Sequence, residues 1–414
     1  MGQYLCLVPQ LAPKPITNSI IVPNIKQLQH QIAQTPAFPR DIERKRRSST
    51  LIRAASATPT MALPLITPQT HPLRSLIVLF TAWKTLLLAI ALGAASVSPG
   101  YDTSTDLFFA HLGSGDDGVV EPPLLARQLT RWDALYFVHA AASKQGGKVY
   151  EQEYAFGTGL SSIINLLARL LSLILHRDTA APPPAYLHAL AGVLIAHIAH
   201  LISALTLYRL TCLVFQPTNP RHWQKKRSVV RIFAFTTAAL HILSPAGMFL
   251  SSPYAEAPFS CLSVVGSYLF ARCYLTPDMF SYATARLIRR NRDMVLAGGV
   301  LGLATWFRSN GLASGLLFAV EMLRCLGLVF KKPGLWPLVG VASAVVGGSL
   351  VGAGSFVPQF LAWERYCGAP ADAGLPTRPW CEDTLPSIYS FVQEHYWYVT
   401  HSLPALHHLL RLLY

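Results

Sequence analysis

Charged side chains are scarce in this sequence. Only 13% of its 414 residues are Asp, Glu, Lys or Arg, and 52% are hydrophobic, whereas soluble domains average about 25% charged residues. The mean hydropathy is +0.36. Apolar stretches such as 75–97 and 335–363 approach or exceed the roughly 20 apolar residues that cross a hydrocarbon core. The composition excludes an ordinary soluble domain and predicts an all-α, multi-pass membrane protein.

Acidic residues are rarer still, with 20 Asp and Glu against 34 Lys and Arg and a net charge of +14. A basic excess of this size can indicate a nucleic-acid partner. Here, however, the basic residues cluster between apolar segments, at 40–53, 221–231, 285–293 and 331–332. This distribution is typical of cytosolic loops that face anionic lipid headgroups. We therefore expect membrane lipids, and no nucleic acid, as partners.

Metal-binding and nucleotide-binding motifs are absent. The sequence contains no HExxH, Walker A or GxGxxG pattern. The "HIAH" stretch at 197–200 places two histidines on adjacent helical faces with no third ligand in view, which leaves a zinc site as a minor alternative. The acid pair in "GSGDDGVVE" (113–121) has glycine-rich flanks and fits a flexible insertion better than a metal site. We expect no metal and no other cofactor.

The sequence contains only seven cysteines, too few to predict a fold held together by a network of disulfides. Four lie in or beside apolar segments, where a free thiol behaves as a small hydrophobe: Cys212, Cys261, Cys273 and Cys325. Cys367 and Cys381 share one polar segment, and a disulfide between them is an open alternative if that segment lies in an oxidising compartment.

The N-terminal residues 1–70 differ from the rest of the chain. They are polar, rich in proline and serine, and include the basic run 44–47, which predicts a disordered cytosolic extension. No apolar core of a signal peptide follows the basic residues. Because Met61 lies just before the first apolar segment, a start of translation there is an open alternative.

The basic clusters set the expected topology. A first span at 75–97 leaves the cytosol and places the loop 98–156 on the lumenal side. Segment 156–178 has leucine and isoleucine at helical spacing, and we interpret it as an amphipathic helix in the membrane interface. As a span it would instead place the cluster 221–231 in the lumen.

The expected transmembrane domain covers 71–362, and a lumenal segment 363–414 follows it. Seven spans result, or eight or nine if one hairpin is divided differently. After the first, the expected spans are 186–215, 232–250, 255–275, 294–308, 311–330 and 335–362.

This topology gathers polar motifs at the lumenal face. Arg308 and Glu256 each interrupt an apolar run near the end of a span, and ionisable groups at that depth usually face a cavity or a partner. Pro245, Gly247 and Pro253 break the helix before Glu256, and irregular backbone at that depth needs a buried or wet surrounding. The sequence predicts one polar cavity that opens on the lumenal side.

The residue types in these motifs suit transfer of a sugar from a lipid phosphate. A carboxylate such as Asp133 can act as a general base on a sugar hydroxyl. Arg131 and Arg308 can bind phosphate oxygens in bidentate fashion, and the neighbouring aromatic rings suit sugar faces.

Structural alternatives stay open for each of these residues. Asp133 is in position to cap the helix that follows it. Arg308 can extend to lipid headgroups. Glu151 and Glu153 fit solvated loop charges.

Five motifs, in this order, carry a family resemblance. They are "RWDALYFVHAA", "YEQEYAFG", "LSPAGMFLSSPYAEAPFSCLSVVG", "TWFRSNG" and "RPWC…PSIYSFVQEHYW". Together they resemble the GPI mannosyltransferase 2 (PIG-V type) family over about 76–397. The resemblance implies a glycosyltransferase of the GT-C class, a multi-pass protein of the endoplasmic reticulum. Such an enzyme adds the second mannose of the GPI precursor through an α-1,6 linkage, with dolichyl-phosphate mannose as donor.

The resemblance also implies roles for individual residues. Asp133 corresponds to the acid of the family's Trp-Asp pair and is expected to be the catalytic base. Arg308 is expected to bind the donor phosphate, while Tyr254 and Glu256 are expected around the sugar or the acceptor. The full set of expected substrate-binding residues is Arg131, Trp132, Glu153, Tyr254, Glu256, Arg308 and Asn310. Expected partners are the two lipid-linked substrates and, as an open alternative, a small membrane subunit.

Two departures from the family and three alternatives accompany this hypothesis. The polar N-terminus is longer than the family's, and the chain ends at Tyr414, where the family continues through further apolar spans. The alternatives are another GT-C enzyme with a different lipid-linked acceptor, a transporter lined by Glu256 and Arg308, and a structural membrane subunit. A structural subunit would tolerate Asp133→Ala, whereas an enzyme would not.

Overall fold

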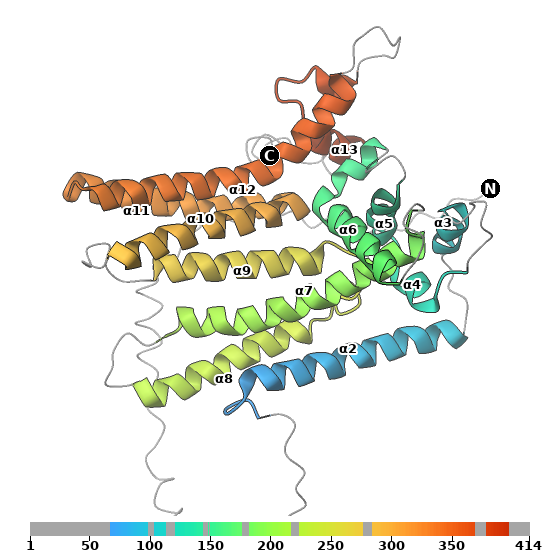
Figure 1. Cartoon of the computed structure of the whole chain (residues 1–414), viewed down its shortest axis with the longest axis horizontal. Helices are drawn as coiled ribbons and strands as arrows, with labels where there is room; N and C mark the ends of the chain where they lie inside the picture. Colours follow the sequence, from blue (N-terminus) through green and yellow to red (C-terminus); the bar gives the residue numbers. More distant parts are fainter. Residues whose placement is uncertain are drawn as a thin grey trace, which may run out of the picture. The chain divides into compact units, whose positions relative to one another are not determined.

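The structure is a computed structural model in which every regular element described is a helix (Figure 1). It describes residues 67–97, 103–112, 121–143, 148, 150–175, 182–216, 223–275, 284–368 and 378–396. The predictions made for 1–66, 113–120 and 397–414 lie outside these residues.

Long helices lie side by side and form the body of the molecule (Figure 1). They are α2 (Pro72–Val97), α7 (Ala185–Val214), α8 (Trp223–Ile242), α9 (Glu256–Tyr274), α10 (Thr284–Phe307), α11 (Gly315–Lys331) and α12 (Leu335–Cys367). Each occupies the region of one expected span, and the prediction of an all-α, multi-pass membrane protein is confirmed.

Four helical segments among the described residues are long and apolar enough to cross a membrane. They are Pro72–Val97, Ala185–Val214, Ser309–Lys331 and Leu335–Cys367. Helices α8 and α10 are less apolar because each begins within a basic cluster. Large apolar side chains such as Leu86, Ile90, Phe330 and Phe356 are exposed on the bundle, as expected of a surface whose solvent is lipid.

Four helix ends differ clearly from the expected boundaries: both ends of α8, the end of α12 and the start of α10, which begins at Thr284 rather than at 294. The basic cluster expected as a loop at 221–231 is helical from Trp223, because lysine and arginine are good helix formers whose long side chains can reach the interface. Helix α8 then ends at Ile242 rather than at 250, shortly before Pro245 and Gly247. Helix α12 continues to Cys367, past the expected boundary at 362, because nothing in "AWERYC" breaks a helix.

Short helices gather at one end of the bundle (Figure 1). They are α3 (Ser104–Leu112), α4 (Leu124–Leu129), α5 (Ala134–Ala142), η2 (Glu151–Ala155), α6 (Thr158–Ile174), η6 (Pro379–Cys381) and α13 (Ile388–Tyr396). The one-turn helix η4 (Ser309–Ser314) joins α10 to α11 at the same end. The starts of α8 and α10 and the end of α11, which carry basic clusters, lie at the opposite end (Figure 1).

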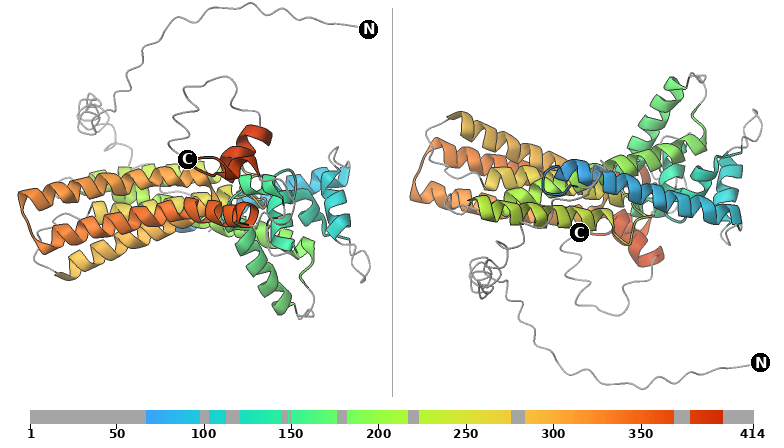
Figure 2. Two further views of the ribbon diagram at one scale, coloured as in Figure 1. Left: turned by 90° about the horizontal axis from the view of Figure 1, so that it is seen from above. Right: turned by 90° about the horizontal axis from the view of Figure 1, so that it is seen from below.

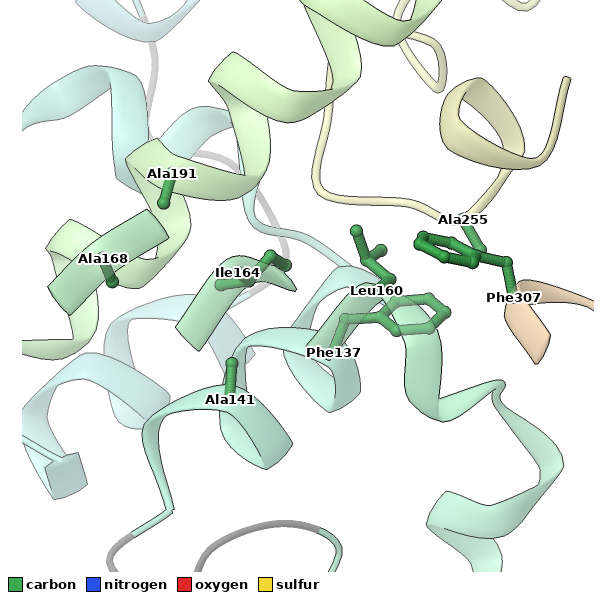
Figure 3. Packing of buried hydrophobic residues seen from close by; sticks show 8 residues of the cluster. All are labelled: Phe137, Ala141, Leu160, Ile164, Ala168, Ala191, Ala255 and Phe307. Carbon is green, nitrogen blue, oxygen red and sulfur yellow. The ribbon is translucent and has the colours of Figure 1, made fainter. Parts of the chain in front are cut away.

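Helix α6 crosses the bundle end instead of joining the long helices, and Figure 2 shows it at a steep angle to them. One face buries Leu160 and Ile164 against Phe137 and Phe307 (Figure 3). On the other face, Leu166 and Leu170 are exposed. An amphipathic helix is thus present at an angle to the long helices, and its non-spanning place in the membrane interface stays a prediction.

Helices α10 and α12 approach each other so closely that only glycine fits between them. A Cβ atom on Gly298 would lie 2.3 Å from the Cα atom of Gly347, and one on Gly354 would lie 2.1 Å from the carbonyl oxygen of Gly302. Small residues of this kind let helix backbones pack tightly in membranes. The contact fixes the end of α10 against the part of α12 that contains Pro358, and both help to form the candidate site.

Candidate active site

A cavity of about 330 Å³ opens at the end of the bundle that carries the short helices; we call it the Asp133 cavity. It is lined by residues from six segments: Asp133–Phe137, Lys148–Gly157, Tyr254–Glu256, Thr305–Asn310, Gly354–Gln359 and Tyr389–Gln393. Of the residues expected from the sequence, it brings together Asp133, Tyr254, Glu256, Arg308 and Asn310.

Asp133 occupies the N-cap position of α5, yet its side chain makes no capping hydrogen bond. The alternative of a capping carboxylate is therefore wrong. The preceding residue, Trp132, has φ 52°, a left-handed conformation that is uncommon for a bulky residue. This turn sets the direction in which the chain enters α5, and Asp133 lines the cavity.

The electrostatic surroundings of Asp133 favour proton uptake. Burial raises the pKa of its carboxyl group above the ordinary value, and the negative charge of Glu256 raises it further. The positive charge of Arg308 partly opposes both effects. A carboxylate whose pKa is raised is a better proton acceptor at neutral pH than an ordinary aspartate.

Glu256 and Arg308 form an ion pair across the cavity. Glu256 is the first residue of α9, and Arg308 follows the last residue of α10 in extended backbone. Their side chains are 40% and 39% exposed, so both stay accessible from the cavity. Arg308 is bound by a carboxylate that also lines the cavity, which contradicts the alternative of an arginine extended toward lipid headgroups.

Tyr254 joins two of the segments that form the cavity. Its buried hydroxyl group donates a hydrogen bond of 2.9 Å to the carbonyl oxygen of Arg131. Burial raises the pKa of Tyr254, as do the charges of Asp133 and Glu256, so the hydroxyl stays protonated as a donor. Tyr254 thereby holds the turn before α5 against the connection that precedes α9.

Three of the expected substrate-binding residues do not line the Asp133 cavity, and Arg131 and Trp132 are the first two. The Arg131 side chain donates to the Gln128 side chain over 2.9 Å. Trp132 is 56% exposed, and its ring centre lies 6.1 Å from that of Phe249. The pair forms an aromatic surface beside the site, because Phe249 also contacts the Tyr254 ring.

Glu153 also lies outside the cavity lining, but it is not a solvated loop charge. It is buried, and its carboxylate is 2.6 Å from Nδ1 of His139 and accepts a 3.0 Å hydrogen bond from the Tyr150 backbone N–H. The hydrogen bond to Glu153 raises the pKa of His139. Glu151 is mostly buried too, 3.4 Å from Nε of Arg378, so the solvated alternative is wrong for both glutamates.

A disulfide joins Cys367 to Cys381, as the sequence allowed, with their Cα atoms 5.7 Å apart. It connects the end of α12 to η6. Beside it, Trp380 is buried and packs with Ile388 and Val392 of α13. The bond therefore holds the segment that carries α13 close to the cavity.

Lys148, Trp306 and Gln359 also line the cavity but did not emerge from the sequence. Trp306 lies inside the "TWFRSNG" motif, two residues before Arg308. Lys148 had a usable signal, because a lysine in a loop expected on the lumenal side runs against the usual charge bias. Gln359 had a weaker signal, since it is an uncharged polar residue that interrupts an apolar run beside Pro358.

Groups of three or more His, Cys, Asp or Glu side chains that could hold a metal ion are absent from the described part of the chain. The two histidines of the "HIAH" stretch contact backbone carbonyls instead. His197 lies 2.8 Å from the Val193 oxygen, and His200 lies 3.2 Å from the His241 oxygen. The expected independence from metal stays a prediction.

Comparison with known proteins identifies the family. The family model described as mannosyltransferase (PIG-V) matches residues 84–402, most of the chain. The chain belongs to the PIG-V mannosyltransferase family. All the segments that line the Asp133 cavity lie within the matched region.

Fungal relatives of this PIG-V family member are similar over most of its length. The chain is 40% identical over 334 residues to "GPI mannosyltransferase 2" of Gibberella zeae, an alignment that covers 80% of the chain and 69% of the relative. It is 39% identical over 345 residues to the protein of the same name from Chaetomium globosum, covering 80% of the chain and 70% of that relative. No solved structure matches the chain.

Proposed function

We propose that this PIG-V family member is the GPI mannosyltransferase that adds the second mannose to the GPI precursor. In this proposal the donor is dolichyl-phosphate mannose and the linkage formed is α-1,6. The observation that carries the proposal is the Asp133 carboxylate, which makes no capping bond and lines a cavity with Glu256 and Arg308. The names of the fungal relatives support the choice of acceptor.

The reaction requires one proton transfer and one exchange of bonds. Asp133 takes the proton of the acceptor's 6-hydroxyl group, and the hydroxyl oxygen forms a bond to C1 of the donor mannose. The bond between C1 and the phosphate oxygen breaks, and dolichyl phosphate leaves with the electron pair. The raised pKa of Asp133 suits this role, because a base works best when its pKa lies near the working pH.

The other cavity residues support binding and orientation. Arg308, already paired with Glu256, is in position to bind hydroxyl or phosphate oxygens, since a guanidinium group has five N–H donors. Asn310 offers both a donor and an acceptor to a sugar. Tyr254 fixes the turn that contains Asp133, and the exposed ring of Trp132 offers a face to a sugar at the cavity margin.

The charge distribution supports an orientation in the endoplasmic-reticulum membrane. Basic clusters at the starts of α8 and α10 and the end of α11 belong on the cytosolic side by the positive-inside rule. The Asp133 cavity lies at the opposite end of the bundle and would then face the lumen. The N-terminus would lie in the cytosol. A small partner subunit stays a prediction.

The function is tested in cells that lack their own second anchor mannosyltransferase and accumulate the one-mannose precursor. The chain and its Asp133→Asn variant are expressed separately, and precursors are measured beside membrane levels of each protein. We expect the chain to clear the precursor and the variant to leave it. If the chain is present in the membrane and the precursor persists, the acceptor assignment is wrong; if both clear it, the base assignment is wrong.

A further inference from the structure

A second cavity, of about 1180 Å³, adjoins the first; we call it the lateral cavity. It extends between α5, α6, the start of α7 and the end of α12, and its wall includes Ser161, Arg169, His188 and Arg365. The two cavities share Lys148, Tyr154, Trp306 and Pro358 in their linings. The Asp133 cavity alone is small for a ligand site, since such sites run from about 300 to 1,000 Å³. A transferase must hold two substrates.

The lateral cavity is cationic. Lys148, Arg169 and Arg365 line it, and none of its described lining residues is acidic. This differs from the Asp133 cavity, which contains two carboxylates. A cavity with cations and no carboxylate attracts an anion.

Two polar atoms in the lateral cavity are buried without a hydrogen-bond partner among the described residues. They are Oγ of Ser161 and Nε2 of His188. Buried polar groups normally have a partner, which can be a ligand or ordered water.

Lys148 stands at the junction of the two cavities. Its side chain is buried, with 6% exposed, and its ammonium group donates to the carbonyl oxygen of Phe156 and lies 4.9 Å from the centre of the Tyr154 ring. Arg365 holds the backbone of Lys148 by a 2.5 Å hydrogen bond to its carbonyl oxygen. An ammonium group has three N–H donors, so Lys148 can bind a further oxygen.

The charge of Lys148 is weakly compensated. Burial lowers the pKa of its ammonium group to about 7, and the charge of Glu153 works against this. Among the described residues, Lys148 forms no ion pair, whereas Arg308 is paired with Glu256. An arriving phosphate would restore the charged form of the lysine and gain a charge-assisted hydrogen bond.

We propose that the lateral cavity binds the phosphate of the lipid-linked sugar donor, with Lys148 as its ligand at the junction with the Asp133 cavity. This inference rests on the proposed function, and it moves the main phosphate ligand from Arg308 to Lys148. The donor is favoured over the acceptor because the breaking bond joins mannose to phosphate. The phosphate must therefore lie within one sugar of the base, and among the residues that the structure describes Lys148 is the cation that lines both cavities.

Binding of the donor product tests this assignment without any need for turnover. The full chain is placed in nanodiscs of neutral lipid, and its affinity is measured for dolichyl phosphate and for uncharged dolichol. We expect Lys148→Met to lower the affinity for dolichyl phosphate by about 10-fold or more. This is the effect of losing one hydrogen bond to a charged group. Dolichol binding should not change, which shows that the variant is folded. Lys331→Met, on an exposed lysine outside both cavities, is the matched control and should bind like the unchanged chain.

Three results of the binding experiment would overturn the inference. The first is that Lys148→Met binds dolichyl phosphate as tightly as the unchanged chain. The second is that the variant loses affinity for dolichyl phosphate and for dolichol by the same factor. The third is that inorganic phosphate competes as well as dolichyl phosphate does, which would indicate a general anion site. A transfer assay separates the substrates: Lys148→Met should raise the KM for the donor and leave that for the acceptor unchanged. A raised acceptor KM alone would assign the cavity to the acceptor and overturn the inference.

Failure of the proposed function gives a different pattern. A chain that binds dolichyl phosphate through Lys148 but transfers no mannose supports the phosphate site and refutes the activity. A chain that transfers mannose equally well with Lys148→Met refutes the phosphate site and leaves the activity standing.

Discussion

Two glutamate–arginine pairs join neighbouring helices near opposite ends of α10, and they differ in burial. Glu256 and Arg308, at the cavity end, are 40% and 39% exposed. Glu321 of α11 and Arg290 of α10, toward the basic end, are 0% and 3% exposed, and Glu321 also pairs with Arg324 at 2.7 Å. Arg308 follows Arg290 by 18 positions, which corresponds to a rise of about 27 Å along a helix.

The comparison shows how one kind of pair can serve two purposes. In the buried pair each charge depends on the other, because water is excluded and an uncompensated buried charge costs several kcal/mol. In the exposed pair the mutual attraction contributes about 1 kcal/mol or less, since solvent screens it. The buried pair thus locks α10 to α11, while the exposed pair can exchange partners with a substrate.

Substitution of Asp133 should have the largest effect on activity and almost no effect on stability. We expect Asp133→Asn to lower the transfer rate by about 10²- to 10⁴-fold, the usual contribution of a general base. Its thermal unfolding should match that of the unchanged chain, because the carboxylate makes no capping bond. Transfer assays and unfolding curves on the same purified samples check both. A large loss of stability would show that Asp133 supports the fold instead.

Substitution of Glu321 should have a large effect on stability and a small effect on activity, the reverse of the result for Asp133. Replacing it with alanine leaves Arg290 buried without its carboxylate and should destabilise the protein by about 3–5 kcal/mol. The transfer rate per folded molecule should stay close to normal, since Glu321 lines neither cavity. Unfolding curves in detergent measure the loss of stability, and transfer assays on the folded fraction measure the rate per folded molecule. Normal stability would remove the contrast between the two pairs.

Arg308 should give a smaller effect, and on activity. We expect Arg308→Ala to lower the transfer rate by about 10- to 100-fold, as for loss of one hydrogen bond to a charged group. Its free energy of unfolding should change by about 1 kcal/mol, because the pair with Glu256 is partly exposed and solvent screens it. Arg308→Lys keeps the charge and serves as the control. A stability loss as large as that of Glu321→Ala would contradict the comparison.

The pH dependence of transfer should give the smallest effect. Asp133 acts as a base only when ionised, so the rate should fall as pH falls through its raised pKa. Glu256→Gln removes a charge that raises this pKa and should move the acid limb to lower pH. Arg308→Ala removes a charge that lowers it and should move the limb to higher pH. Rate profiles of the three proteins over a pH series are the measurement, and shifts in the same direction would contradict the assignment.

The sequence predicted much of the site because helix ends follow from local rules. Glu256 comes directly after a stretch broken by proline and glycine, and Arg308 ends an apolar run, so both could be placed near a membrane surface. The alternation of spans then brought them to the same side as Asp133. For Arg131, Trp132 and Glu153 sequence proximity was a poorer guide, because the turn at Trp132 and the contact of Glu153 with His139 direct them elsewhere.

The sequence by itself determined the membrane class, the basic end of the bundle and the helix breaks that carry Glu256 and Arg308, because hydropathy, charge bias and proline act locally. The tertiary structure alone decided which ionisable groups meet. Glycine contacts bring α12 against α10, and the backbone of Lys148 is held by Arg365, 217 residues away. Such contacts depend on packing between distant segments, and no local pattern encodes them.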